Sequence, residues 1–306
     1  MCLDIPERGA GPTGSAERAR SRLRRLVGGI IARLPAPTPL RQAQRALPWR
    51  QLLTQATALW VATRLAYALL TFYFPVVTSG ASLSRTPTPL AELIRRWTLW
   101  DGQWYIAIAR RGYWDFTPTA FFPLYPGAIR LVEAVIGPHW ATAALIASNL
   151  GSLLAFFGVA ALAAQVATPG DERRNARTAI TLFAAYPMAL FLVAAYSDGL
   201  FAGLAALALL CAFRRRWWWA ALFGLLTALC RPTAPALLLP IAWEAFQRFR
   251  ERRGEVAAGQ ALREIAPMLA ALVAPLAGIG AYCAWLWARF GDPLSCVSAA
   301  SAVSAR

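Results

Sequence analysis

The sequence contains no lysine, a single histidine and no CxxC pair of cysteines. His139 has no cysteine or histidine nearby, and the five cysteines are not spaced as zinc ligands or as a disulfide framework. These absences exclude a zinc domain and a small disulfide-stabilised scaffold. The sequence therefore predicts no metal ligands.

The short motifs of nucleotide-dependent and hydrolytic enzymes are also missing. No GxxxxGK(S/T), HExxH or GxSxG occurs, so P-loop nucleotide-binding, zinc-protease and serine-hydrolase functions have no support. The first 50 residues lack the apolar stretch of a signal peptide, so we expect the first membrane helix to be an uncleaved anchor.

The composition is that of a membrane protein. Hydrophobic residues make up 58% of the chain and charged residues 15%, whereas soluble domains carry about 25% charged residues. All 31 basic residues are arginines, and the net charge is +16. Because these arginines lie between long apolar segments, we expect lipid headgroups and membrane topology to explain them, and no nucleic acid partner.

The apolar segments predict an all-α, polytopic bundle of about seven membrane-spanning helices. The expected spans are residues 51–77, 140–166, 178–195, 199–213, 217–246 and 265–288. The segment 217–246 is either one span with Arg231 deep inside or two short spans that turn at Arg231 and Pro232. The positive-inside rule favours the hairpin, which places 21 of the 31 arginines on the cytoplasmic side.

Three regions follow from this pattern. Residues 1–50 are an Arg-rich, partly disordered cytoplasmic segment, and residues 51–294 are a transmembrane domain. Its outer loop, residues 78–138, is expected to contain amphipathic interfacial helices. Residues 295–306 are a tail of small residues.

The outer loop contains the stretch WTLWDGQWYIAIARRGY, residues 97–113. As a single helix it has one apolar stripe, formed by Trp97, Trp100, Trp104 and Ile108. Tryptophans flanked by arginines are typical of a helix in the headgroup layer. Asp101 lies beside this stripe, where a carboxylate can reach a lipid-borne phosphate ester and an acceptor hydroxyl. We therefore interpret Asp101 as a catalytic base; the alternative is an exposed acid that caps a helix.

Other charged residues are expected near Asp101. Asp198 lies in a short turn between two spans, and Arg231 precedes a proline; an arginine facing two acids suits a phosphate-bearing donor. The alternatives are a hydrated turn and a snorkelling arginine. Arg110 and Arg111 are either further donor-phosphate contacts or headgroup anchors. The residues expected to line the substrate pocket are Trp100, Gln103, Tyr105, Tyr196 and Asp198.

Six motifs in order resemble the PIG-V-like mannosyltransferases, which belong to the polytopic GT-C glycosyltransferases. The resemblance extends over residues 52–294. The motifs are WDGQWYIAIARRGYW, AFFPLYP, SNLGSLLAFFG, AYPMALFLVAAYSDGLF, RRRWWWAALFGLLTALCRPTAP and RFGDP.

The resemblance implies transfer of mannose from a polyprenyl- or dolichyl-phosphate donor to a hydroxyl of a glycolipid or glycan. The reaction is expected outside the cytoplasm, at a bacterial plasma membrane or, in a eukaryote, at the endoplasmic reticulum. An acidic residue of the first outer loop acts as the base, which corresponds to Asp101, while Asp198 and Arg231 match further family positions. No cofactor is required, although a divalent metal between the two aspartates is compatible with the sequence.

The end of the chain departs from the family pattern. Members continue past the GDP motif with a Trp-containing stretch and further spans, whereas this sequence ends in CVSAASAVSAR. We therefore expect a C-terminally truncated member. The alternative functions are a lipid or solute transporter and a degenerate, non-catalytic membrane protein, although the absence of a repeated half disfavours a transporter.

Overall fold

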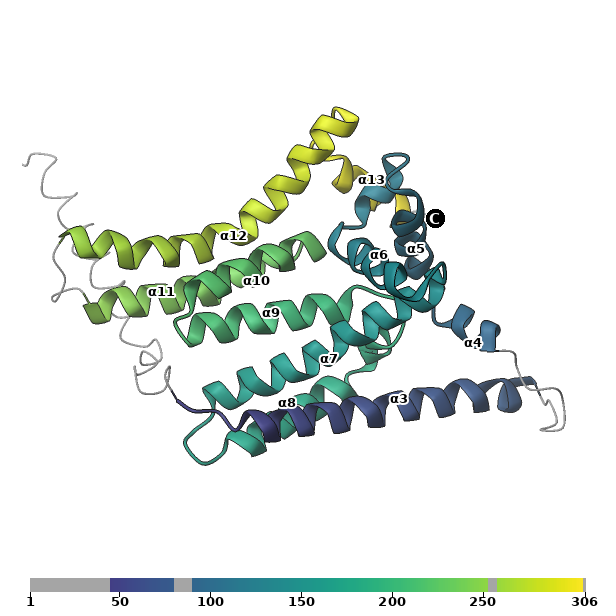
Figure 1. Cartoon of the computed structure of the whole chain (residues 1–306), viewed down its shortest axis with the longest axis horizontal. Helices are drawn as coiled ribbons and strands as arrows, with labels where there is room; N and C mark the ends of the chain where they lie inside the picture. The colour runs from purple at the N-terminus through teal and green to yellow at the C-terminus, as the bar shows by residue number, and fades with distance from the viewer. Residues whose placement is uncertain (1–44, 80–89, 253–257, 305–306) are drawn as a thin grey trace, which may run out of the picture. The chain divides into compact units, whose positions relative to one another are not determined.

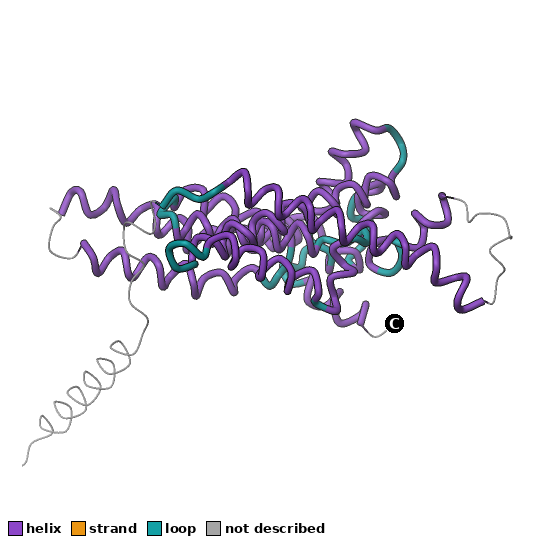
Figure 2. The backbone as a smooth tube through the Cα atoms, turned by 90° about the horizontal axis from the view of Figure 1, so that it is seen from below, coloured by secondary structure: helices purple, strands orange, loops and turns teal. Residues whose placement is uncertain are grey.

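The computed structural model describes residues 45–79, 90–252 and 258–304. Every regular element within these residues is an α- or 3₁₀-helix, which confirms the all-α prediction (Figure 2). The chain divides into two units, residues 1–37 and 38–306, and the fold described below belongs to the second. The expected Arg-rich segment, residues 1–50, lies almost wholly outside the described residues.

Five helices lie side by side and form the body of the bundle (Figure 1). They are α3 (Trp49–Ser79), α7 (Trp140–Val166), α9 (Asp198–Phe213), α10 (Trp217–Cys230) and α12 (Ala258–Phe290). Helix α7 packs between α3 and α9, and α10 packs between α9 and α12. Two described helices, α7 and the Ile265–Phe290 part of α12, are long and apolar enough to cross a membrane, while α9 and α10 are shorter apolar helices.

The expected span over residues 178–195 is not a continuous helix. Helix α8 (Glu172–Ala185) ends before Pro187, and a 3₁₀ turn, η2 (Pro187–Leu192), follows. Fourteen residues extend for only about 21 Å, which is less than the ~30 Å hydrocarbon core of a bilayer. The chain from Pro187 onward is therefore irregular backbone whose polar groups need partners inside the protein.

The segment 217–246 forms a helical hairpin. Helix α10 ends at Cys230, a 3₁₀ turn, η3 (Ala234–Leu237), follows, and α11 (Leu238–Arg252) returns along the bundle (Figure 1). Arg215, in the turn before α10, forms a 2.7 Å ion pair with Glu251 near the end of α11. This pair places the two ends of the hairpin at the same end of the bundle, which matches the hairpin alternative.

Glycines allow α7 and α9 to approach closely. A Cβ atom on Gly199 would lie 2.7 Å from the backbone nitrogen of Ser152, and one on Gly203 would lie 2.9 Å from that of Ala155. Gly199 and Gly203 are four residues apart, the spacing at which small residues bring membrane helices together. Asp198 directly precedes this contact, so the α7–α9 packing fixes the position of its backbone.

Short elements gather at the end of the bundle where α7 and α9 begin (Figure 1). They are α4 (Leu90–Arg96), α5 (Asp101–Arg111), η1 (Thr117–Ala120), α6 (Leu124–Ile136) and α13 (Ser295–Ser304). The single helix was expected to begin at Trp97. This start is wrong, because α5 begins at Asp101. The expected tail is helical up to Ser304, and this helix, α13, packs against η1.

Candidate functional site

Asp101 is the first residue of α5 and follows a residue with unusual backbone geometry. Trp100 has a φ of 53°, a left-handed conformation uncommon for a residue with a side chain. The Asp101 carboxylate is about half-buried, and burial raises its pKa; the positive charge of Arg231 lowers the pKa and the negative charge of Asp198 raises it. Because no described residue donates a hydrogen bond to this carboxylate, Asp101 is not a helix cap.

Asp198 and Arg231 form an ion pair beside Asp101. Asp198 is the first residue of α9, Arg231 directly follows α10, and their Oδ1 and Nη1 atoms are 2.5 Å apart. Burial lowers the pKa of Arg231, but Asp198 and two other neighbours together raise it more than burial lowers it. The net pKa therefore lies above its ordinary value, and the guanidinium stays charged. The first turn of α5, the first turn of α9 and the end of α10 thus bring two carboxylates and one guanidinium together.

The loop before α9 is bonded directly to α5 and the turn that precedes it. The backbone N–H of Asp101 donates to the Tyr196 hydroxyl at 3.3 Å, and the Tyr105 and Ser197 hydroxyls lie 2.9 Å apart. The backbone N–H of Ala195 donates to the Trp97 carbonyl at 2.9 Å. A Cβ atom on Gly102 would lie only 3.3 Å from the Ala195 carbonyl oxygen. These contacts fix the loop 194–198 relative to Asp101.

Side chains from α3 and α7 hold the irregular backbone that leads into this loop. Arg64 Nη2 donates to the Leu192 carbonyl at 2.6 Å, and Asn149 Nδ2 donates to the Val193 carbonyl at 3.2 Å. Ser148 Oγ donates to the Ala194 carbonyl at 2.5 Å. Arg64, Asn149 and Ser148, named together the carbonyl clamp, thus satisfy three consecutive carbonyls that a helix would otherwise have bonded.

Only one feature of the sequence points to the carbonyl clamp, a lone arginine inside an apolar segment. Arg64 also donates from Nε to Asn149 Oδ1 at 2.9 Å and bonds Ser152 through Nη2. Its guanidinium carbon lies 4.8 Å from the centre of the Trp60 ring. Arg64 therefore faces the interior of the bundle and does not snorkel to the membrane surface, the other orientation open to a lone arginine in an apolar helix.

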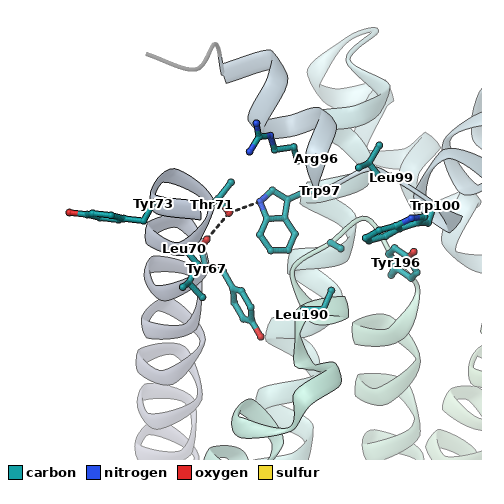
Figure 3. Close-up of a pocket in the computed structure, with 11 residues that line it drawn as sticks. Tyr67, Leu70, Thr71, Tyr73, Arg96, Trp97, Leu99, Trp100, Leu190 and Tyr196 are labelled. Carbon is teal, nitrogen blue, oxygen red and sulfur yellow. Dashed lines mark hydrogen bonds between the residues drawn. The ribbon is translucent and has the colours of Figure 1, made fainter. Parts of the chain in front are cut away.

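A mostly apolar cavity of about 640 Å³ lies between α3 and the turn that precedes α5 (Figure 3). Side chains of α3, including Tyr67 and Thr71, form one wall, and Trp100 and Tyr196 form the wall nearest Asp101. Trp97 lies between these walls, and its indole N–H donates to Thr71 Oγ1 at 3.1 Å. The cavity offers apolar and aromatic surface. Asp101, Asp198 and Arg231 do not line it, but Tyr196 does, and its hydroxyl accepts the hydrogen bond from the Asp101 backbone.

The remaining predicted residues are placed differently. Trp100 is 70% exposed, and Gln103 is exposed on α5. Arg110 and Arg111 end α5, about 15 Å along the helix axis from Asp101, so the structure does not bring them to the charged cluster. Their contact with the donor stays a prediction. Within the described residues, no three His, Cys, Asp or Glu side chains gather as a metal site would need.

Comparisons with known proteins assign the chain to a family. No curated protein and no solved structure matches the chain. The model of the family described as mannosyltransferase (PIG-V) matches residues 56–252. This match covers more than half of the chain and includes Asp101, Asp198, Arg231 and the carbonyl clamp. The chain therefore belongs to the PIG-V mannosyltransferase family and is a glycosyltransferase.

Proposed function

We propose that the protein transfers mannose from a polyprenyl-phosphate donor to a hydroxyl of a glycolipid or glycan acceptor, with Asp101 as general base. The observation that carries this proposal is the cluster of Asp101, Asp198 and Arg231. One half-buried carboxylate has no hydrogen-bond donor among the described residues, while the other is paired with the arginine. A half-buried carboxylate that accepts no hydrogen bond from its neighbours has a raised pKa and is therefore suited to take up a proton.

The chemistry assigns a separate role to each group. The acceptor oxygen attacks the anomeric carbon and forms the new glycosidic bond, while Asp101 accepts the hydroxyl proton. The bond between the anomeric carbon and the phosphate oxygen breaks, and its electron pair stays on the phosphate. Arg231 stabilises the charge of this leaving group. Asp198 holds the guanidinium in place through the 2.5 Å ion pair, and the reaction needs no cofactor.

The apolar cavity supports a lipid-linked donor. Its wall contains Trp100 and Tyr196, which adjoin Asp101 in sequence or by hydrogen bond. A polyprenyl chain in the cavity would leave its phosphate at the polar rim, toward the charged cluster. Such a ligand buries apolar surface and keeps its charged group beside a guanidinium, as both ends of an amphiphile require.

The proposed topology has seven spans, a cytoplasmic N-terminus and Asp101 on the outer face. Arg45, Arg214 and Arg215 lie at the end of the bundle opposite to Asp101, as the positive-inside rule expects. Asp115 and Arg174 are exposed near opposite ends. In a cysteine-free background, Asp115→Cys should react with an impermeant thiol reagent from outside, and Arg174→Cys only after permeabilisation. Labelling of both from the same side would contradict the topology.

The test of the catalytic role is Asp101→Asn. Asparagine keeps the size of the side chain but accepts no proton at neutral pH, so transfer should fall by about 10²–10⁴-fold. Asp115→Asn is the matched control: it is an exposed aspartate of the same outer segment and should retain full transfer. The assay uses membranes containing equal amounts of each variant, labelled polyprenyl-phosphate mannose and candidate acceptors. Near-normal transfer by the Asn variant would remove Asp101 from the mechanism.

A further inference from the structure

Three arginines line a second cavity, at the far end of α5 from Asp101. Arg111 ends α5, Arg130 lies in the middle of α6, and Arg289 lies near the end of α12. The cavity has a volume of about 430 Å³ and also contacts Tyr113 and Trp285, whose rings are 5.1 Å apart. Within the described residues, none of the three arginines forms an ion pair with an acidic side chain.

Arg130 is held in an orientation that leaves most of its hydrogen-bonding capacity unused. Its Nε donates to the Ala109 carbonyl at 2.5 Å. No residue that the structure describes accepts a hydrogen bond from its two terminal nitrogens. A guanidinium fixed through Nε presents those nitrogens as a fork, which matches two oxygens of a phosphate group. The two neighbouring arginines add positive charge, so the cavity is suited to an anion.

An apolar groove joins this cavity along α6. It has a volume of about 680 Å³ and shares Pro123, Gly127 and Arg130 with the arginine-lined cavity. Beyond Arg130 the groove is lined by leucines of α6, α9 and α10, namely Leu124, Leu131, Leu200, Leu204, Leu226 and Leu229. A site that is cationic at one end and apolar along its length is complementary to one anionic head and one hydrocarbon chain.

We propose that this joined site binds an anionic phospholipid of the outer leaflet, with its phosphate on Arg111, Arg130 and Arg289 and one acyl chain in the leucine groove. The bound phosphate compensates three like charges contributed by α5, α6 and α12 and so holds these helices together. The site differs from the proposed sugar-donor site, because Arg111 lies about 15 Å along α5 from Asp101.

The experiment counts lipids retained by the protein in an uncharged detergent, using native mass spectrometry. The full chain is titrated with phosphatidylglycerol, with phosphatidylcholine of the same chain length and with inorganic phosphate. We expect one phosphatidylglycerol to bind in preference to phosphatidylcholine. Arg130→Gln and Arg289→Gln should each weaken phosphatidylglycerol binding about tenfold, as expected for the loss of one charge-assisted contact. Arg174→Gln, an exposed arginine on α8, should not change it.

Two further measurements distinguish binding of a lipid from binding of another anion. Leu131 is 74% exposed and lines the groove, so Leu131→Glu should weaken lipid binding by repelling the chain and the phosphate, whereas Leu131→Ala should have little effect. Inorganic phosphate at millimolar concentration should not displace the lipid. Displacement by phosphate alone, equal binding of both phospholipids, or retention of binding in Arg130→Gln would each overturn the proposal. Thermal unfolding of every variant distinguishes lost binding from lost folding.

Discussion

The two ends of the bundle use their charged residues differently. At the arginine end, on the left of Figure 1, Arg45 pairs with Glu172, and Arg214 donates to Gln165 at 2.9 Å. Arg215 pairs there with Glu251 at 2.7 Å. At the aspartate end, on the right, one carboxylate of the cluster has an ionic partner and the other has no hydrogen-bond donor among the described residues. At the first end each of these three arginines has a side-chain acceptor, whereas at the second end one carboxylate has no described donor.

This difference separates structural charge from candidate catalytic charge. A polar group that is satisfied by neighbours contributes to folding and has little capacity left for a substrate. A half-buried carboxylate without a donor costs stability, and such a cost is expected at functional sites. This difference supports the proposed catalytic role of Asp101 and indicates a structural role for Glu251, although both are acids beside an arginine.

Among the variants that test this difference between the two ends, Arg231→Gln should cause the largest loss of mannose transfer. Glutamine removes the cation that stabilises the leaving phosphate and leaves Asp198 without its ionic partner. Loss of one electrostatic contact to a developing charge costs about 10²–10³-fold in rate. The measurement is the turnover rate for mannose transfer at saturating donor, in membranes with matched protein levels.

The matched control for Arg231→Gln is Glu251→Gln at the arginine end. It breaks the ion pair with Arg215 and should lower the free energy of unfolding by about 1 kcal/mol, the usual size for a pair near the surface. Transfer should be unchanged. If both variants lose transfer to the same extent, the two ends do not differ as proposed.

A smaller effect is expected at the carbonyl clamp. Arg64→Gln removes the donor to the Leu192 carbonyl and loosens the segment that carries Tyr196 toward Asp101. We expect turnover to fall about tenfold, since small displacements of positioning groups are costly, while the donor KM changes little. Arg64→Lys should restore part of the loss. Arg50→Gln, at an exposed arginine of the same helix, is the control and should leave turnover unchanged.

The long apolar helices could be predicted from the sequence, because the hydrophobicity of consecutive residues is enough to specify them. Residues 140–166 and 265–288 were expected as spans, and α7 and the Ile265–Phe290 part of α12 occupy these positions. The hairpin at Arg231 could be predicted for the same reason, since prolines and arginine bias mark the turn where α10 ends. Patterns along the chain suffice where neighbouring residues decide the structure.

The irregular segments could not be predicted, because residues distant in sequence decide them. The helix expected over 178–195 ends at Ala185, before Pro187. Beyond it, the carbonyls of residues 192–194 are held by Arg64, Asn149 and Ser148, over sequence separations of 128, 44 and 46 residues. The helix expected from Trp97 likewise begins later, because the Trp97 carbonyl bonds Ala195. The proximity of Asp101 to Asp198 and Arg231 followed from topology, but the unpaired state of Asp101 did not.

The smallest effect we expect is a shift in the pH dependence of turnover. It tests most directly whether the three charged residues at the aspartate end are electrostatically coupled. Asp101 must be ionised to act as a base, so transfer should fall as the pH drops through its pKa. Because burial raises that pKa, the acidic limb of turnover should lie above the pH expected for an ordinary aspartate, about 4.

Asp198 raises the pKa of Asp101, whereas Arg231 lowers it. Asp198→Asn should therefore move the limb to lower pH, and the residual activity of Arg231→Gln should show a limb at higher pH. Loss of stability would move both limbs in the same direction, whereas electrostatic coupling to one base moves them in opposite directions. The measurement is turnover at saturating substrate across pH 4–8 for the three proteins, with unfolding followed in parallel; coincident limbs would show that Asp101 is not the titrating group.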